Sequence, residues 1–239
     1  MNAVTTPDDA EMPEIAAHGS LAAALHALAP DLRIEPEHHR RVRIPSARPG
    51  RDPLSVAPAA VAGMWAFGAW TGGIQMIHGM CGALTDLVPV ATAWQDGVLM
   101  SDIKVLAPFA SVPRRAEAYD HGPDHVVSEE WRALHEQADS VDWPQFRELV
   151  ATAAAEPRLR QLYPYTSHWS LRFSTTTGYP FSPDLVILDA PHGAGRFGMR
   201  IAWSGPVTEA DSAAEAVALA VAHLPADLGP AVPGCYHHG

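Results

Sequence analysis

The chain has 239 residues, with 27 acidic against 16 basic side chains and a formal net charge of −11. An acidic chain without a basic face repels phosphate backbones, which argues against a nucleic-acid partner. No apolar run reaches the roughly 18 residues needed to span a bilayer, and the N-terminus lacks the basic start and apolar core of a secretory signal. We therefore expect an acidic, cytoplasmic protein without nucleic-acid or membrane partners.

The two cysteines, Cys81 and Cys235, are far apart in the sequence and do not form a CxxC motif. In a cytoplasmic chain such residues are most simply free thiols. The sequence therefore predicts no disulfide.

The first half of the chain predicts a short helix followed by strands. Ser20 is a good N-cap for a helix whose apolar residues recur at i, i+3, i+4 and i+7. Two strands are expected over 64–70 and 74–77, and Gly72-Gly73 between them favours a two-residue hairpin turn.

Helices are expected next. Thr85 is placed to cap a helix with one apolar stripe, and Gly97 is placed to end it. The more charged segment 113–157 reads as helical, with Ser128 and Asp142 as candidate N-caps. These helices are expected to cover a sheet.

Apolar and polar residues alternate over 168–174, which is the period of a strand with one buried face. The apolar face would carry Trp169, Leu171 and Phe173, and the polar face His168, Ser170, Arg172 and Ser174. Alternate side chains on one strand face stand about 6.6 Å apart, so one small molecule could touch two or three of them. The polar face is therefore a candidate binding row.

Aromatic turns flank this strand. Tyr163 and Tyr165 enclose a proline before it, and Tyr179 stands next to a proline after it. Loops of this composition tend to line the mouth of a binding site. We predict a site in which Tyr163, Tyr165, Ser170 and Tyr179 bind the ligand.

The candidate catalytic residues are His168 and Arg172. A histidine exchanges protons near neutral pH, and an arginine on the same face can hold a carboxylate or phosphate. The structural alternative is a strand with its polar face in water, in which His168 bonds a neighbouring carbonyl and Arg172 makes a surface ion pair of little energetic value.

Common cofactor and metal motifs are missing from the sequence. It contains no Walker loop, GxGxxG, GxSxG or HExxH pattern. Its thirteen histidines do not form the spaced ligand pairs of a zinc site. We therefore expect no cofactor and no metal.

Two short strands, over 185–188 and 197–203, precede a final helix, which has a capping box from Ser212 to Glu215. The order strand, strand, strand, helix thus occurs twice, and two half-repeats are an alternative to a fold without internal symmetry. Each half leaves an apolar sheet face that needs a cover, which favours one α+β domain. The predicted parts are a disordered lead-in over 1–19, a single α+β domain over 20–232 with half-units about 42–97 and 168–225, and a flexible tail over 233–239.

The stretch LRQLYPYTSHWSLRFSTTTGYP and the later run AAEAVALAVAHLPADLGPAV resemble an actinobacterial family of uncharacterised natural-product-biosynthesis proteins, defined only as a domain of unknown function. The resemblance covers most of the chain from about Ser20 onward and is closest in the last third. It implies work in or beside a secondary-metabolite pathway and carries over no catalytic residue.

Two hypotheses of function follow. The first is a cofactor-independent tailoring or cyclising enzyme that acts on a biosynthetic intermediate around His168 and Arg172. The second is a non-catalytic accessory protein that binds a precursor peptide, a carrier protein or a partner enzyme, for which an accepting strand edge would suffice. An enclosed cavity with both residues facing inward would favour the enzyme, and an open aromatic surface would favour the binding protein.

Overall fold

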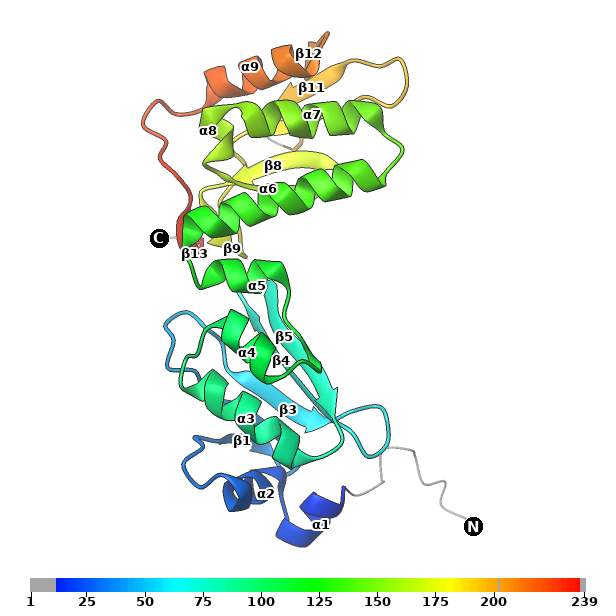
Figure 1. Ribbon diagram of the computed structural model, residues 1–239. Coiled ribbons are helices and arrows are strands. Elements are labelled where there is room, and N and C mark those ends of the chain that lie inside the picture. The colour runs from blue at the N-terminus through cyan, green and yellow to red at the C-terminus, as the bar shows by residue number, and fades with distance from the viewer. Residues whose placement is uncertain (1–11, 202, 237–239) are drawn as a thin grey trace. The chain divides into compact units, whose positions relative to one another are not determined.

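The computed structural model describes residues 12–201 and 203–236. The chain divides into two compact units, with the boundary between Asp120 and His121. Each unit combines antiparallel strands with helices, so the predicted α+β class is confirmed (Figure 1). The single domain over 20–232 stays a prediction.

The first unit is built on one antiparallel sheet in which strand order follows chain order. Its strands are β1 (Glu35–His38), β2 (Arg41–Ile44), β3 (Leu54–Pro58), β4 (Trp65–Thr71), β5 (Ile74–Cys81) and β6 (Ala110–Ser111). Its helices are α1 (Pro13–His18), α2 (Leu21–Leu28), α3 (Leu84–Gln95), α4 (Met100–Leu106) and α5 (Arg114–Tyr119). A meander of this kind needs only short connections between neighbouring strands.

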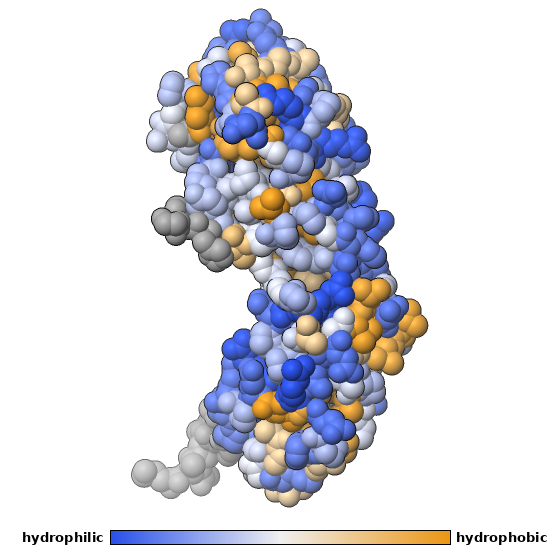
Figure 2. Space-filling model, turned by 90° about the vertical axis from the view of Figure 1, so that its left-hand side faces the viewer, coloured by the Kyte–Doolittle hydropathy of each residue, from blue (hydrophilic) through white to orange (hydrophobic). Residues whose placement is uncertain are grey.

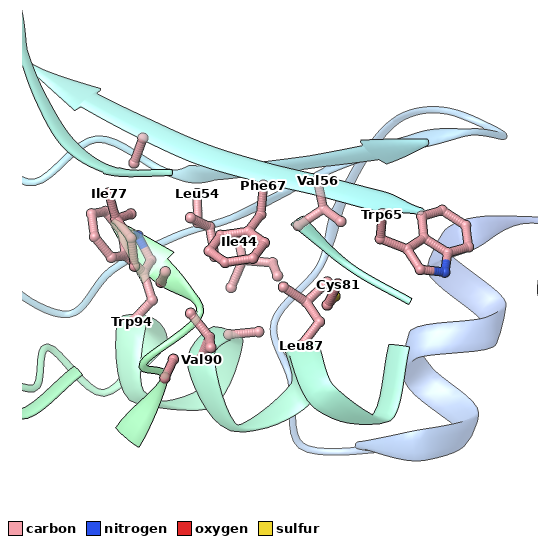
Figure 3. Packing of buried hydrophobic residues seen from close by; sticks show 14 of the residues in the cluster. Ile44, Leu54, Val56, Trp65, Phe67, Ile77, Cys81, Leu87, Val90 and Trp94 are labelled. Carbon is pink, nitrogen blue, oxygen red and sulfur yellow. The ribbon is translucent and has the colours of Figure 1, made fainter. Parts of the chain in front are cut away.

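The predicted hairpin is confirmed as β4 and β5, joined at Gly72 and Gly73. Both glycines have positive φ, 56° and 80°, the left-handed conformation that a tight two-residue turn requires. Alternate residues of β4 then face one side, where Trp65 and Phe67 are buried in the core that also contains the apolar side chains of α3. Figure 3 shows this core, in which apolar side chains of the strands meet those of the helix.

A buried ion cluster lies beside this core. Asp120 accepts a hydrogen bond from Arg51 at 2.8 Å and from the backbone N–H of Met100 at 2.5 Å, and its carboxylate lies 3.0 Å from Arg48 Nε. The Asp120 and Arg51 side chains are 3% and 2% exposed. Burial lowers the pKa of Arg51, and the charge of Asp120 opposes that change. The carboxylate therefore neutralises a guanidinium that has almost no access to water.

Some predicted boundaries in this unit are confirmed and others are shifted. Ser20 caps α2 as expected, with its hydroxyl accepting from Ala23 N at 3.1 Å. The helix predicted to start after Thr85 begins two residues earlier, at Leu84. Pro13–His18, predicted to be part of a disordered lead-in, form α1, whose Ile15 is buried. Residues 1–11 of that lead-in lie outside the described residues.

The second unit contains a five-stranded antiparallel sheet in the order β12-β11-β10-β8-β7. These strands are β7 (Tyr163–Ser167), β8 (Ser170–Ser174), β10 (Ile187–Asp189), β11 (Phe197–Arg200) and β12 (Thr208–Ala210). A separate parallel pair joins β9 (Thr176–Gly178) to β13 (Val232–Cys235). The helices are α6 (Pro123–Ser140), α7 (Pro144–Ala155), α8 (Pro157–Arg160) and α9 (Ala213–His223).

One face of this sheet is apolar and covered by helices. Leu171 and Phe173 of β8, Leu188 of β10 and Met199 of β11 are all buried. The helices α6 and α9 contact these strands or their neighbours, and α7 packs on both of them (Figure 1). Of the alternation predicted for 168–174, the apolar face is observed in β8, and Arg172 lies on the face opposite the helices, but Ser170 and Ser174 on that face are also buried.

The helix starts in this unit depart from the predicted caps. α6 begins at Pro123, so Ser128 lies inside the helix, and α7 follows Trp143 where Asp142 was expected to cap. Proline is favoured in the first turn because its missing N–H would have no partner there. The predicted capping residue Ser212 is confirmed, since its hydroxyl accepts from Glu215 N at 3.2 Å.

The C-terminal segment differs from the prediction of a flexible tail. Residues 233–235 of that tail lie in β13, which pairs with β9 and leaves most of its own side chains exposed. Residues 237–239 lie outside the described residues. The backbone pairing explains the order of this segment, because apolar periodicity gives no sign of it.

The face shown in Figure 2 is mainly hydrophilic and is interrupted by separate apolar patches. Val105, Leu106 and Phe109, at and after the end of α4, are among the exposed apolar residues. No helix in the described ranges is both long and apolar enough to cross a membrane.

Candidate functional site

The open face of the second sheet carries a row of side chains set by strand register. Tyr165 of β7 lies opposite Arg172 of β8, Arg172 opposite Ile187 of β10, and Ile187 opposite Arg200 of β11. Residues directly opposite in antiparallel strands project to the same face. Two arginines thus flank one isoleucine on the face that the helices leave free.

Trp203 covers this row. Its ring centre lies 4.7 Å from the guanidinium carbon of Arg172 and 4.5 Å from that of Arg200. Ile187, between the two arginines in the row, is fully buried. Trp203 therefore makes cation–π contacts with both arginines, and the isoleucine between them is shielded from solvent.

A second row contains Ser170, predicted as a binding residue. Its hydroxyl donates to Asp189 at 2.5 Å, and the same carboxylate accepts from Arg200. Ser170 is buried and belongs to this internal network. Ser170 helps to hold Arg200 through the shared carboxylate of Asp189. It is not among the lining residues of the pocket described below.

The predicted strand over 168–174 begins later than expected. His168 and Trp169 form the two-residue turn between β7 and β8, with φ of 52° and 67°. The Trp169 ring packs near Phe146 of α7 at 5.6 Å, and the His168 ring lies 5.8 Å from Trp203. Trp169 thus lies on the side of the sheet that the helices cover and His168 on the opposite side, as predicted. His168 is, however, an exposed turn residue and not a strand residue.

The positive φ angles of this turn lead to a prediction about stability. Side chains other than glycine and asparagine are disfavoured at positive φ, so His168→Asn is expected to stabilise the protein by about 0.5–1 kcal/mol. Trp169→Gly relieves the same conformation but removes the contact with Phe146, so it is expected to be destabilising. Thermal unfolding of both variants measures this difference, and a lower midpoint for His168→Asn would contradict the prediction.

A pocket of about 550 Å³ lies between β7 and the loop that follows β9. It is open to solvent. Its lining residues are Tyr165, Thr166, Ser167, Arg172, Tyr179, Pro180, Phe181, Ser182, Pro183 and Asp184. The structure thus brings Arg172, Tyr165 and Tyr179 together as predicted, whereas His168, Ser170 and Tyr163 are not among the lining residues.

Asp184 organises the polar side of the pocket. Tyr165 donates a hydrogen bond to Asp184 Oδ1 at 3.1 Å, and Arg172 Nη2 lies 3.6 Å from Asp184 Oδ2. Burial, helped by the charge of Asp184, raises the pKa of Tyr165 to about 12, so the phenol keeps its proton and remains a donor. Arg172 Nε is buried and has no hydrogen-bond partner among the described residues.

Phe181 organises the aromatic side. Its ring centre lies 4.4 Å from that of Tyr165 in a stacked pair, 5.3 Å from that of Tyr163 and 5.7 Å from that of Tyr179. Tyr179 is 65% exposed, whereas Tyr163 is 4% exposed. Tyr163 therefore supports Phe181 from inside the unit, and Tyr179 offers a ring to solvent.

Buried hydroxyls hold the pocket loop in place. Ser174 Oγ accepts from the backbone N–H groups of Thr176 and Ser182, and Ser182 Oγ accepts from Thr175 N. The parallel partner β13 and the residue after it add further bonds, from Val232 N to the carbonyl of Thr175 and from Tyr236 N to the carbonyl of Pro180. These bonds position the turn that carries Tyr179 and Phe181.

The free edge of β7 borders the same pocket. Ser167 and Ser170 flank a two-residue turn, so their backbone groups bond to each other, and every second residue of β7 bonds to β8. The backbone groups of Pro164 and Thr166 therefore point away from β8. Proline has no N–H, so only Thr166 can donate from this edge. An added peptide strand would find few partners here.

Sequence reasoning missed four important residues: Asp184, Asp189, Arg200 and Trp203. Asp184 follows Pro183, a turn signal near the aromatic flank that could have indicated it. Asp189 and Arg200 are brought to this face by pairing between strands, and Trp203 lies in the turn after β11, so none of these three carries a local signal. Across the described ranges, no group of three or more His, Cys, Asp or Glu residues could hold a metal ion.

Comparison with known protein families gives a match that lies within the second unit. The sequence model of a family of unknown function, DUF6193, matches residues 125–235. The match runs from α6 to β13 and so includes the sheet and every residue of the pocket. No curated protein and no solved structure matches the chain.

Proposed function

We propose that the second unit binds a small intermediate of natural-product biosynthesis in the pocket beside β7, and that the protein is a non-catalytic accessory factor of that pathway. The observation that carries this proposal is the open pocket in which Arg172 and Asp184 stand beside the exposed ring of Tyr179 and the half-buried rings of Tyr165 and Phe181. The pathway context rests on the resemblance of the stretch around 159–180 to the actinobacterial family. A cytoplasmic location and a pathway partner protein belong to the same proposal.

Binding is favoured over catalysis by the position of the histidine. An enzyme site at this place would bring His168 and Arg172 into one enclosed cavity. Arg172 lines the pocket, but His168 is exposed on the turn, and the pocket is open. A proton donor must lie within hydrogen-bond reach of the reacting group, and His168 is not among the residues that would touch a bound compound.

A small compound is favoured over an extended peptide. The volume of about 550 Å³ lies in the range of small-molecule sites. The free edge of β7 offers few backbone donors because Pro164, one of the two residues whose backbone points away from β8, has no N–H. The ligand is therefore held by side chains and not by an added strand.

The test is a gene deletion in a producing strain, complemented with the wild-type protein, Arg172→Gln or His168→Ala, each shown to fold by circular dichroism. We expect deletion to lower the yield of the final product, and the wild-type protein and His168→Ala to restore it. Arg172→Gln is expected to restore little, because loss of one charge-assisted bond costs about 1.5–3 kcal/mol, roughly 10- to 100-fold in affinity.

Mass spectrometry of the metabolites supplies the readout. If the deletion accumulates a discrete precursor that His168→Ala fails to convert, the protein is a tailoring enzyme and the accessory role is wrong. If Arg172→Gln restores the yield fully, the pocket is not the binding site.

A further inference from the structure

The pocket combines one cationic, one anionic and several aromatic groups, and this combination points to one class of ligand. We infer that the ligand is a free α-amino acid with an aromatic side chain, whose carboxylate meets Arg172, whose ammonium group meets Asp184 and whose ring lies against Phe181 and Tyr179. This inference rests on the proposed binding function and names the chemistry of the ligand.

The ion pair in the pocket is loose. Arg172 Nη2 and Asp184 Oδ2 are 3.6 Å apart, which exceeds the length of a hydrogen bond. The two side chains are 15% and 20% exposed at the pocket wall. Both groups can therefore form stronger bonds with a ligand than they form with each other.

A zwitterion satisfies both groups together. The ammonium and carboxylate groups of an α-amino acid are bonded to the same carbon, so they can reach a cation and an anion that stand side by side. A ligand with only one of these charges would partly desolvate Arg172 or Asp184 without compensating it. The site would therefore select against compounds capped at either end.

The aromatic side of the pocket selects the side chain. Phe181 is half-buried, with Tyr165 stacked on it at 4.4 Å and Tyr179 meeting it edge-on. Tyr179 is 65% exposed. An added ring can join this group by stacking or edge-to-face contact, which contributes about 0.5–1.5 kcal/mol beyond the area it buries. A small or polar side chain would lose this contribution.

Calorimetry and amide-detected NMR on the whole protein test the inference with four probes: L-phenylalanine, N-acetyl-L-phenylalanine, L-phenylalanine amide and L-alanine. L-phenylalanine is expected to shift the amide signals of Thr166, Ser167 and Asp184. Each capped derivative and L-alanine are expected to bind at least about 10-fold more weakly.

Substitutions inside and outside the pocket test where the amino acid binds. Asp184→Asn is expected to weaken the binding of L-phenylalanine about 10-fold. The binding of L-phenylalanine amide is expected to weaken by the same factor, because both compounds carry the ammonium group. The matched control is Glu209→Gln, which changes an exposed carboxylate of the same unit that pairs with Arg196 outside the pocket. It is expected to leave the affinity unchanged within twofold.

Two results would overturn the inference. If the capped derivatives shift the same amides with equal affinity, the zwitterion is wrong but the pocket remains a binding site. If none of the four probes shifts these amides, the amino-acid class is wrong, and the strain experiment decides the accessory role separately.

Discussion

Replacing Asp120 with alanine is expected to lower the free energy of unfolding of the first unit by about 3–5 kcal/mol. The carboxylate accepts bonds from Arg51 and from Met100 N, and the side chains of Asp120 and Arg51 are both almost completely buried. Without Asp120, the guanidinium of Arg51 keeps its charge but loses its counterion. The stacking of Arg51 on Trp94, at 4.8 Å, does not replace that counterion.

Hydrogen exchange followed by mass spectrometry measures this effect in each unit separately. Exchange in β3, β4 and β5 is expected to rise strongly in Asp120→Ala. The matched control is Glu117→Ala, which removes a nearby carboxylate whose ion pair with Lys104 is exposed. It is expected to cost less than about 1 kcal/mol, and an equal effect of both variants would contradict the argument.

Phe173→Ala is expected to destabilise the second unit by about 3–5 kcal/mol. Phe173 is fully buried on the apolar face of β8, where its ring centre lies 6.1 Å from that of Trp131 of α6. Truncation removes apolar contact and leaves a cavity that the sheet and helices can fill only in part. Tyr179→Ala, which removes an exposed ring from the same unit, serves as the control and is expected to change stability by less than about 0.5 kcal/mol.

The same exchange measurement reads out Phe173→Ala, and the two core variants together test the domain prediction. If the chain is one cooperative domain, each variant raises exchange in both units. If the units open independently, Asp120→Ala acts before the boundary at Asp120 and Phe173→Ala acts after it. Unchanged exchange in β8 and β10 of Phe173→Ala would contradict the packing argument.

Local signals predicted much of the fold. Gly72-Gly73 marked the turn between β4 and β5 because only glycine adopts positive φ at little cost. Ser20 and Ser212 marked the starts of α2 and α9 because their hydroxyls satisfy free backbone donors. In each case the physical cause lies within a few residues of the element that it determines.

The turn at His168 and Trp169 could not be read in this way. Neither residue is a turn signal, and their alternation continues the pattern of β8 without a break. The pattern therefore predicted the side of the sheet correctly and the strand start incorrectly. Arg172, Tyr165 and Tyr179 were predicted as site residues because their types and alternation are local properties.

Long-range partners could not be predicted. Asp120 and Arg51 are 69 positions apart in sequence, and Tyr165 and Asp184 are 19 apart. Arg200 reaches the polar face only because β10 pairs with both β8 and β11. Tertiary pairing of this kind depends on the whole unit, so a single sequence gives no local sign of it.

The pairing of β9 with β13 has a consequence for the order in which the protein is made. Val232 must be synthesised before it can lie beside Thr176, so the strand that braces the pocket loop leaves the ribosome after the sheet and after α9. When α9 has been synthesised, every strand of the five-stranded sheet has been made, but one wall of the pocket still lacks its support. The ligand site can therefore be completed only after the whole sheet has left the ribosome.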